Sequence, residues 1–303
     1  MAPPGQRHAH AAPVRSCVRL RPLSSHERAT SAFSVSGTKL SLRREVLEEE
    51  GRADWLADSE YNFDAVFGPE TSTATVYARA AAEIVPWCVK GVNCTIIAYG
   101  QTAAGKTHTM LGAQAVHSPR AALPASGHTS ERGMIALAVD DVLRRVGAAG
   151  QRRHRLRVSF LEIYNEQCND LLAADRGANL KLFERADGVV VPGVSEWDVS
   201  DSDKLEALLR QAERQRHVGT TYSNDRSSRS HLLCTVSVDS WAGNGSSDAP
   251  SATGAPGAPA PSGADPNVLS ATLQLVDLAG SERRQAASEG QSHEGACIPP
   301  HLP

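Results

Sequence analysis

Eight consecutive residues have the types and spacing of a phosphate-binding loop. They are Gly100, Gln101, Thr102, Ala103, Ala104, Gly105, Lys106 and Thr107, which fit the pattern GxxxxGK[ST] without a gap. Glycines let backbone N–H groups curl around phosphate oxygens, the lysine neutralises terminal phosphates, and the threonine hydroxyl is a ligand for Mg²⁺. A helix that begins here adds the positive end of its dipole. The loop therefore predicts binding of a nucleoside triphosphate with Mg²⁺.

A second segment with this chemistry is the DxxG sequence from Asp277 to Gly280, which follows an apolar run over residues 273–276. An aspartate in this position can hold Mg²⁺ through water, and the glycine N–H can bind a γ-phosphate. Taken alone, DxxG is more often a turn after a strand. Together with the phosphate loop, it predicts a site for nucleotide hydrolysis.

The polar run NDRSSRSH, residues 224–231, precedes a predicted strand. In isolation, such a run is best interpreted as a solvated loop. Its hydroxyl and guanidinium groups could instead close over a γ-phosphate as a switch segment.

The elements around these motifs indicate an α/β protein. Apolar residues recur at helical spacing over residues 73–90, which predicts one amphipathic helix. The apolar, β-branched run 94–99 predicts a strand buried on both faces, and the phosphate loop and a short helix follow it. This order of elements is the α/β signature. We also expect helices over 134–146 and 201–216 and strands over 16–20, 156–164, 231–238 and 268–276, whereas 24–60 is polar and irregular.

Composition excludes several classes of protein. A formal net charge of -3 argues against a generally basic nucleic-acid binder, so no nucleic-acid partner is expected. The six cysteines contain no CxxC pair, which disfavours a zinc site or a disulfide framework and indicates a reducing compartment. No apolar run of 18 residues occurs, so no membrane span is expected.

Two segments are expected to lack regular structure. Residues 1–13 form a disordered leader without the apolar region of a secretory signal. Residues 242–267 consist almost wholly of Gly, Ala, Ser, Pro and Asp, too few large apolar residues to offset the entropy of ordering. We interpret the second as a disordered surface loop between two neighbouring strands. The four arginines of 152–157 are interpreted as a solvated approach to a strand.

Three segments, AYGQTAAGKTHTM (98–110), NDRSSRSH (224–231) and LVDLAGSE (275–282), resemble the phosphate loop, switch I and switch II of the kinesin motor family, in that order. VRLRP (18–22), YNFDAVF (61–67) and FLEIYNEQCNDLL (160–172) are similar to further blocks of the family. The resemblance covers residues 14–290 and implies an ATP-hydrolysing microtubule motor. It also implies a P-loop NTPase fold of the kinesin type, with a mixed, mostly parallel central sheet flanked by helices. The implied location is the cytoplasm and the microtubule cytoskeleton.

The resemblance also implies residue roles. Lys106 and Thr107 would bind the phosphates and Mg²⁺ of ATP, with Ser228 and Asp277 also at the metal. The adenine would be bordered by Arg21, Pro22, Tyr77 and His108. For Tyr77 the alternative is ordinary packing, and for His108 it is simple surface exposure.

The roles in hydrolysis fall to Ser228, Arg229, Gly280 and Glu282. By resemblance, Arg229 and Glu282 form an ion pair that positions the attacking water when the switches close. One departure from the family concerns Ala103, where relatives often have glycine or a small residue. Because alanine is uncomfortable at positive φ, we expect an altered nucleotide affinity.

The family pattern is not followed after Glu282. A switch II helix, a microtubule loop and a neck linker are expected in relatives, and residues 291–303 resemble none of them. No heptad repeat occurs, so dimerisation is not expected from this chain. We therefore predict a partial motor domain whose last core strand is missing beside the phosphate-loop strand. The alternative function is a truncated, non-motile fragment that at most binds nucleotide and drives no microtubule gliding. A signalling GTPase is disfavoured because no NKxD motif follows.

Overall fold

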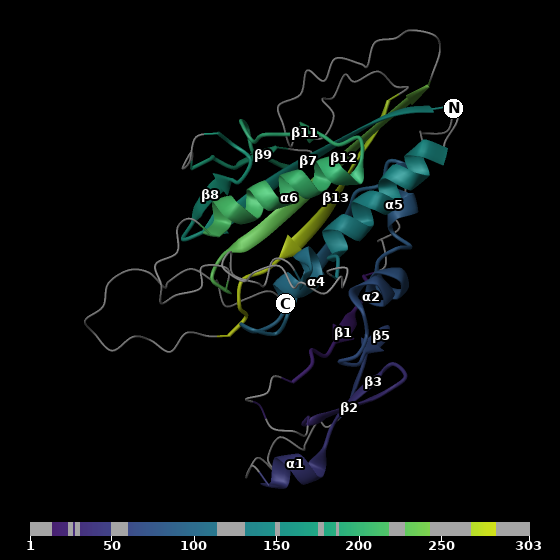
Figure 1. Ribbon diagram of the computed structural model, residues 1–303, viewed down its shortest axis with the longest axis vertical. Coiled ribbons are helices and arrows are strands. Elements are labelled where there is room, and N and C mark those ends of the chain that lie inside the picture. Colours follow the sequence, from purple (N-terminus) through teal and green to yellow (C-terminus); the bar gives the residue numbers. More distant parts are fainter. Residues whose placement is uncertain are drawn as a thin grey trace, which may run out of the picture. The chain divides into compact units, whose positions relative to one another are not determined.

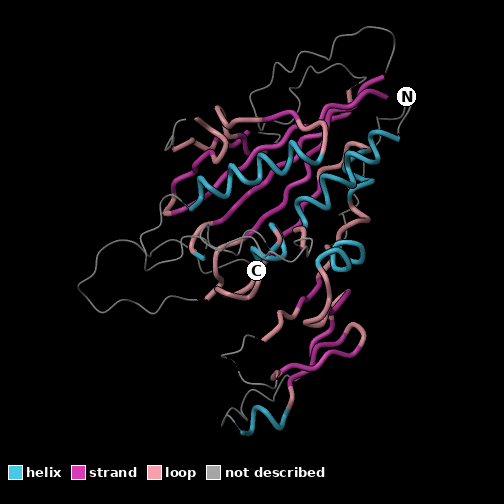
Figure 2. Tube along the Cα trace, in the orientation of Figure 1, coloured by secondary structure: helices cyan, strands magenta, loops and turns pink. Residues whose placement is uncertain are grey.

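The computed structural model describes a set of segments that divide into two compact units, Met1–Thr71 and Ser72–Pro303 (Figures 1 and 2). The described residues are 14–23, 27, 31–49, 60–113, 131–148, 152–174, 179–185, 188–217, 228–242 and 268–282. The expectations for the leader, for residues 224–227 of the polar run, for residues 243–267 of the loop 242–267 and for the tail after Glu282 therefore lie outside the described residues.

The described part of the first unit contains two small sheets and one helix. β1 (Cys17–Arg19) pairs in parallel with β5 (Ala65–Phe67), which confirms the strand expected at 16–20. The strands β2 (Phe33–Ser36), β3 (Lys39–Leu42) and β4 (Glu60–Asn62) form an antiparallel sheet, and α1 spans Arg44–Glu49. The prediction that 24–60 is irregular is therefore wrong for residues 33–49. In β2 and β3, Phe33 lies opposite Leu42 and Val35 opposite Leu40, so a short alternation gives one apolar face.

The second unit is built on a mixed sheet in the strand order β11-β7-β12-β13-β6, with β8 also paired to β7. The strands are β6 (Cys94–Ala98), β7 (Arg152–Tyr164), β8 (Gln167–Asp170), β11 (Trp197–Asp198), β12 (His231–Ala242) and β13 (Leu269–Asp277). β9 (Phe183–Arg185) and β10 (Gly188–Val190) form a separate hairpin.

The mixed character of the sheet is confirmed, but the prediction that it is mostly parallel is wrong. Among the described strands of this sheet, β13 and β6 pair in parallel and the remaining pairs are antiparallel. Strands joined directly to a neighbour run antiparallel, whereas a parallel pair needs a crossover. β12 and β13 are antiparallel neighbours, which confirms that the segment between them joins adjacent strands.

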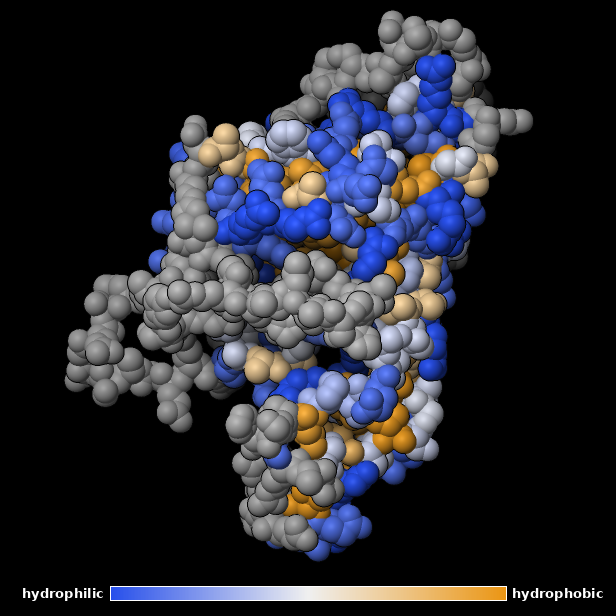
Figure 3. All heavy atoms as spheres, in the orientation of Figure 1, coloured by the Kyte–Doolittle hydropathy of each residue, from blue (hydrophilic) through white to orange (hydrophobic). Residues whose placement is uncertain are grey.

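The helices of the second unit are α2 (Thr73–Ala80), α3 (Val85–Val89), α4 (Lys106–Leu111), α5 (Met134–Ala148) and α6 (Ser202–His217). α3, α4 and α5 pack on strands of the sheet, and α6 packs against α5 (Figure 1). The apolar stripe predicted for α6 is buried, with Leu205, Leu208, Leu209 and Ala212 all inside. Figure 3 shows mainly hydrophilic side chains over the outer side of this helical layer. Among the described residues, none of the helices has the length and apolar composition to cross a bilayer.

One helix predicted over residues 73–90 is two helices. α2 begins after Ser72, whose hydroxyl accepts a hydrogen bond from the Thr75 N–H, and it ends at Ala80. Proline lacks a backbone N–H and collides with the preceding turn of a helix, so Pro86 is accommodated in the first turn of a new helix, α3.

β6, which leads into the phosphate loop, forms one edge of the sheet. Within the described part of the chain, β6 pairs with β13 alone. Thr95 is exposed and Ile97 is 59% exposed, so the prediction of a strand buried on both faces is wrong for these residues. The reason is that the described helices cover one face of the sheet, where Leu273 and Leu275 of β13 are buried.

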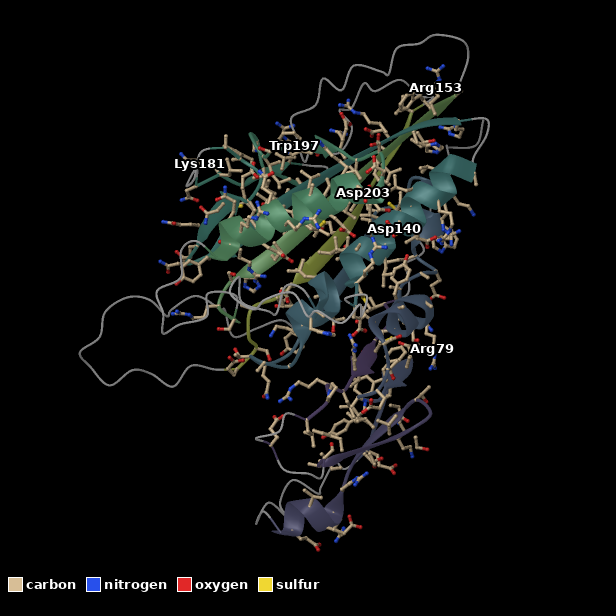
Figure 4. All side chains as sticks on the ribbon, in the orientation of Figure 1. Arg79, Asp140, Arg153, Lys181, Trp197 and Asp203 are labelled. Carbon is tan, nitrogen blue, oxygen red and sulfur yellow. The ribbon has the colours of Figure 1, made fainter. Side chains whose placement is uncertain are left out.

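The arginines of 152–157 belong to β7 itself rather than to a solvated approach. Arg157 forms ion pairs with Glu196 and Asp239, and Arg155 forms one with Asp198 of β11. Figure 4 shows Arg153 at the N-terminal end of β7. The positive charge of the run is therefore balanced mainly by acidic neighbours on the sheet.

A close backbone crossing holds the end of α4 against the start of α5. A Cβ on Gly133 would lie 2.3 Å from the Met110 carbonyl oxygen, and a Cβ on Gly112 would lie 2.5 Å from the Glu131 carbonyl oxygen. Gly112 also has φ +101°. Because α4 carries Lys106 and Thr107, this crossing helps to fix the phosphate loop.

We expect Gly133→Ala to lower the free energy of unfolding by about 1–3 kcal/mol, because the added methyl group overpacks two backbone segments. The matched control is Gly147→Ala inside α5, where nothing lies within 4 Å of the added Cβ. That change should leave stability equal or raise it by up to about 1 kcal/mol. Urea unfolding measures both. Equal effects of the two substitutions would contradict a tight crossing.

Candidate nucleotide-binding site

The parallel pairing of β6 with β13 brings the phosphate loop and the DxxG motif to the same edge of the sheet. Ala98 lies opposite Asp277 at the carboxyl ends of the two strands. The Leu278 N–H donates to the Ala98 carbonyl oxygen at 3.2 Å, and the Ser281 N–H donates to that of Gly100 at 3.1 Å. Two motifs far apart in the sequence are therefore joined by their backbones.

Positive φ angles shape the phosphate loop. Gly100, Ala103 and Gly105 have φ values of 153°, 61° and 91°, and Ala104 N–H donates to the Gln101 carbonyl oxygen at 3.2 Å. A left-handed conformation costs a residue with a Cβ about 1 kcal/mol or more. Ala103 therefore adopts the positive φ that the sequence analysis identified as uncomfortable for alanine.

Lys106 lies across this loop. Its Nζ donates to the Gln101 carbonyl oxygen at 2.8 Å. Burial lowers the pKa of Lys106, and the nearby carboxylates of Asp277 and Glu282 oppose this shift. Within the described segments, no carboxylate lies at ion-pair distance from Nζ. The ammonium group can therefore form an ion pair with a bound anion.

Asp277 lies at the centre of a buried polar cluster. Its Oδ2 accepts a hydrogen bond from the Thr107 hydroxyl at 2.7 Å and one from Arg216 Nη1 at 3.3 Å. Only 1% of Asp277 is exposed. Its Oδ1 is buried and has no hydrogen-bond partner among the described residues. An orphaned carboxylate oxygen beside a threonine hydroxyl suits a Mg²⁺ ion or its bound water.

Arg216, in the last turn of α6, is a site residue that the sequence analysis missed. It is 3% exposed, and its guanidinium donates to the hydroxyl and carbonyl oxygens of Ser230. Its Nε also lies 3.8 Å from Oε1 of Glu162, which is buried in β7. One guanidinium therefore faces two buried carboxylates.

A signal for Arg216 was present in the sequence. It continues the apolar stripe of α6 at the spacing of Leu205, Leu209 and Ala212, so a charged residue falls on the buried face of the helix. A buried arginine requires an acidic partner, which this position alone does not identify.

The segments that begin at Ser228 and Asp277 are joined by backbone contacts. Gly280 N–H donates to the Ser228 carbonyl oxygen at 2.9 Å, and Ala279 N–H donates to His231 Nδ1 at 3.1 Å. Burial lowers the pKa of His231, which favours the neutral ring that this acceptor role requires. The described part of the predicted switch I therefore lies against the DxxG motif.

Glu282 contacts the phosphate loop. Its Oε2 accepts from the Thr102 N–H at 2.8 Å, and its Oε1 accepts from the Thr102 hydroxyl. The Thr102 hydroxyl is the main cause that lowers the pKa of Glu282. Among the described residues, Glu282 has no ion pair with Arg229 in this arrangement. That pairing stays a prediction for a closed state.

The residues expected around the adenine have other partners. Tyr77 is 8% exposed, and its hydroxyl donates to Asp141 Oδ2 at 3.0 Å between α2 and α5. Burial raises the pKa of Tyr77. His108 Nε2 lies 3.6 Å from Glu131 Oε2. These contacts favour the packing alternative for Tyr77, and the adenine contacts of both residues stay predictions.

Arg21 and Pro22 lie in the first unit. Both terminal nitrogens of Arg21 donate to the carboxylate of Glu27, with Nη1 at 2.7 Å from Oε2. Their contact with an adenine likewise stays a prediction.

The helices behind the site are joined by a further polar contact. Asp140 of α5 accepts a hydrogen bond from the hydroxyl of Ser202, the first residue of α6, at 2.8 Å, and it also pairs with Arg132. Figure 4 shows Asp140 and Asp203 on these two neighbouring helices. This contact ties the start of α6 to α5, and the other end of α6 carries Arg216.

We expect Arg216→Met to lower the free energy of unfolding by about 3–5 kcal/mol, because it leaves the buried Asp277 carboxylate without the Arg216 guanidinium. The matched control is Arg210→Met, on the same helix, which removes an exposed pair with Glu206. That control should cost less than about 1 kcal/mol. Urea unfolding compares the two, and similar losses would contradict a buried ion-pair cluster.

Comparisons with known proteins identify the family. The family model of the kinesin motor domain matches residues 19–300, which reaches past residue 290, where the sequence resemblance ended. "Kinesin-like protein KIN-7C, mitochondrial" of Arabidopsis thaliana is 38% identical over 252 residues, which cover 81% of this chain and 25% of that protein. "Kinesin-like protein KIN-7G" of Oryza sativa subsp. japonica is 38% identical over 267 residues, which cover 84% of this chain and 26% of that protein.

A solved structure, "Structure of a fast kinesin: Implications for ATPase mechanism and interactions with microtubules", has a TM-score of 0.70 and 26% sequence identity. The aligned region covers 92% of this chain and 69% of the chain in the solved structure. The chain thus spans about a quarter of the length of the curated relatives and most of the length of this solved neighbour.

Proposed function

Because this chain belongs to the kinesin motor domain family, we propose that it binds and hydrolyses Mg-ATP and that this hydrolysis serves movement along microtubules. The observation that carries the proposal is the hydrogen bond between Thr107 of the phosphate loop and Asp277 of the DxxG motif. It joins the two motifs beside a buried carboxylate oxygen that has no hydrogen-bond partner in the described part of the chain.

In this proposal the phosphate loop captures the nucleotide. The backbone from Gly100 to Gly105 surrounds the phosphates, and Lys106 transfers its hydrogen bond from a backbone carbonyl to a phosphate oxygen. Thr107 and Asp277 would hold Mg²⁺, and the bound ion would neutralise charge on the phosphate oxygens. Arg216 holds the Asp277 carboxylate in place through a buried ion pair.

Hydrolysis then depends on positioning, because phosphoryl transfer to water needs no covalent intermediate with the protein. Gly280 would offer its N–H to the γ-phosphate after leaving the Ser228 carbonyl oxygen, its acceptor in this structure, and Ser228 would reach the phosphate and the metal. Arg229 and Glu282 pair when the switches close and orient the attacking water. Support for this step comes from the contact between Gly280 and Ser228, which already joins the two segments.

Microtubules are the proposed partner, and the cytoplasm and the microtubule cytoskeleton are the proposed location. Family membership supports this proposal, and the solved neighbour is described by its interactions with microtubules. The relatives include proteins named mitochondrial and chloroplastic. The second candidate function is nucleotide binding without movement. Among the described strands β6 pairs with β13 alone, and a strand with one unpaired edge weakens the sheet through which movement would be transmitted.

We expect Lys106→Ala to weaken binding of a fluorescent ATP analogue by about 100-fold or more, because the loop loses its cation for the phosphates. Secondary structure should not change, as circular dichroism would show. The control is Lys204→Ala, on α6, where the ammonium lies over the Trp197 ring. Unaltered affinity after Lys106→Ala would refute the site.

We expect Glu282→Ala to retain ATP binding and to lose microtubule-stimulated ATP turnover by about 100-fold or more, because the residue acts in switch closure rather than in capture. The control is Glu206→Ala, which removes a half-exposed carboxylate on α6. Steady-state phosphate release with and without microtubules measures the effect. Turnover of the Glu282 variant at the parental rate would show that its assigned role is wrong.

A further inference from the structure

We infer that Thr102 is a positioning residue that holds the Glu282 carboxylate on the phosphate loop, and that an arriving terminal phosphate displaces the carboxylate toward Arg229. This inference rests on the proposed function and names how nucleotide capture reaches the second switch. Thr102 thereby couples the phosphate loop to the acid used in hydrolysis.

The contact between the two residues uses both carboxylate oxygens. Oε2 accepts from the Thr102 N–H at 2.8 Å, and Oε1 accepts from the Thr102 hydroxyl. A single residue thus supplies two donors to one exposed carboxylate. Such a paired arrangement fixes the orientation of the acid more firmly than one hydrogen bond would.

Gly280 lies against this contact. A Cβ on Gly280 would approach both carboxylate oxygens of Glu282 and the Thr102 hydroxyl to 2.5 Å. The N–H of the same glycine donates to the Ser228 carbonyl oxygen at 2.9 Å, and Arg229 follows directly in the chain. Gly280, which lies against the Glu282 carboxylate, is therefore also hydrogen-bonded to the segment that carries Arg229.

Electrostatics provides the reason for an exchange of partners. The held carboxylate occupies the backbone and hydroxyl donors of a loop whose pattern binds phosphate. A terminal phosphate at this loop brings negative charge close to the carboxylate, and the two anions repel each other. The donors of Thr102 can then serve the phosphate, while the released carboxylate gains a bidentate partner in the Arg229 guanidinium.

A double-mutant cycle on nucleotide affinity tests the exchange. The dissociation constant of a non-hydrolysable ATP analogue with Mg²⁺ is measured for the full chain, for Thr102→Val, for Glu282→Ala and for the double variant. Any direct contact of the Thr102 hydroxyl with phosphate contributes equally with and without Glu282. The difference between the two backgrounds therefore isolates the interaction that is lost on binding.

Thr102→Val changes the dissociation constant by some factor in each background. We expect this factor to be about three- to tenfold smaller when Glu282 is present than in the Glu282→Ala background. The reason is that, with Glu282 present, valine also removes one charge-assisted hydrogen bond from the nucleotide-free state. Thr102→Ser keeps the hydroxyl and should bind like the parental chain. Arg229→Ala should weaken binding with Glu282 present and have little effect in the Glu282→Ala background.

Three outcomes are separable. An equal effect of Thr102→Val in both backgrounds would overturn the inference, while binding that still requires Lys106 would leave the proposed function intact. A serine variant that behaves like valine would also overturn it, because the hydroxyl would then not be the group that acts. Failure of the parental chain to bind the analogue would contradict the proposed function and the exchange together.

Discussion

The buried negative charge of Asp277 is the constraint on which the rest of the site depends. Removing a carboxylate from water is costly unless it is paired and hydrogen-bonded. The compensating groups come from two helices: Arg216 from the end of α6, at 3.3 Å, and Thr107 from the start of α4, at 2.7 Å. One strand end and two helix ends are therefore held around a single carboxylate, and its second oxygen is buried without a hydrogen-bond partner among the described residues.

The strand arrangement explains why this carboxylate meets the phosphate loop. Most described pairs in the sheet are antiparallel, and such neighbours place their carboxyl ends at opposite edges. β6 and β13 run in parallel, so Ala98 and Asp277 end side by side and the loops that follow them share one edge. The glycine crossing at Gly112 and Gly133 then holds α4 close to α5. The site thus lies at the parallel pair of a mainly antiparallel sheet.

The parts predicted well from the sequence are those encoded by contiguous residues. The phosphate loop, the DxxG motif and the stripe of α6 each depend on local spacing, and the structure has strands or helices where they were expected. Strand direction was predicted wrongly because it depends on how connections cross the sheet. Glu162 and Arg216 were missed because their role in the site depends on a contact between β7 and α6, which sequence spacing does not reveal. The four-residue strands β2 and β3 are too short for a reliable periodic signal.

The carboxylates of Asp277 and Glu282 are held by different interactions, and this difference matches the two roles that we propose for them, metal ligand and switch residue. Asp277 is buried and paired with a buried arginine, an arrangement whose disruption costs several kcal/mol, so it is fixed. Glu282 is exposed and bonded to one threonine, and exposed charged contacts of this kind contribute about 1 kcal/mol or less. A metal ligand must keep its position when the nucleotide arrives. In the proposed exchange, an interaction of modest size must release the switch residue, and a phosphate charge at the same loop would release Glu282 and leave Asp277 in place.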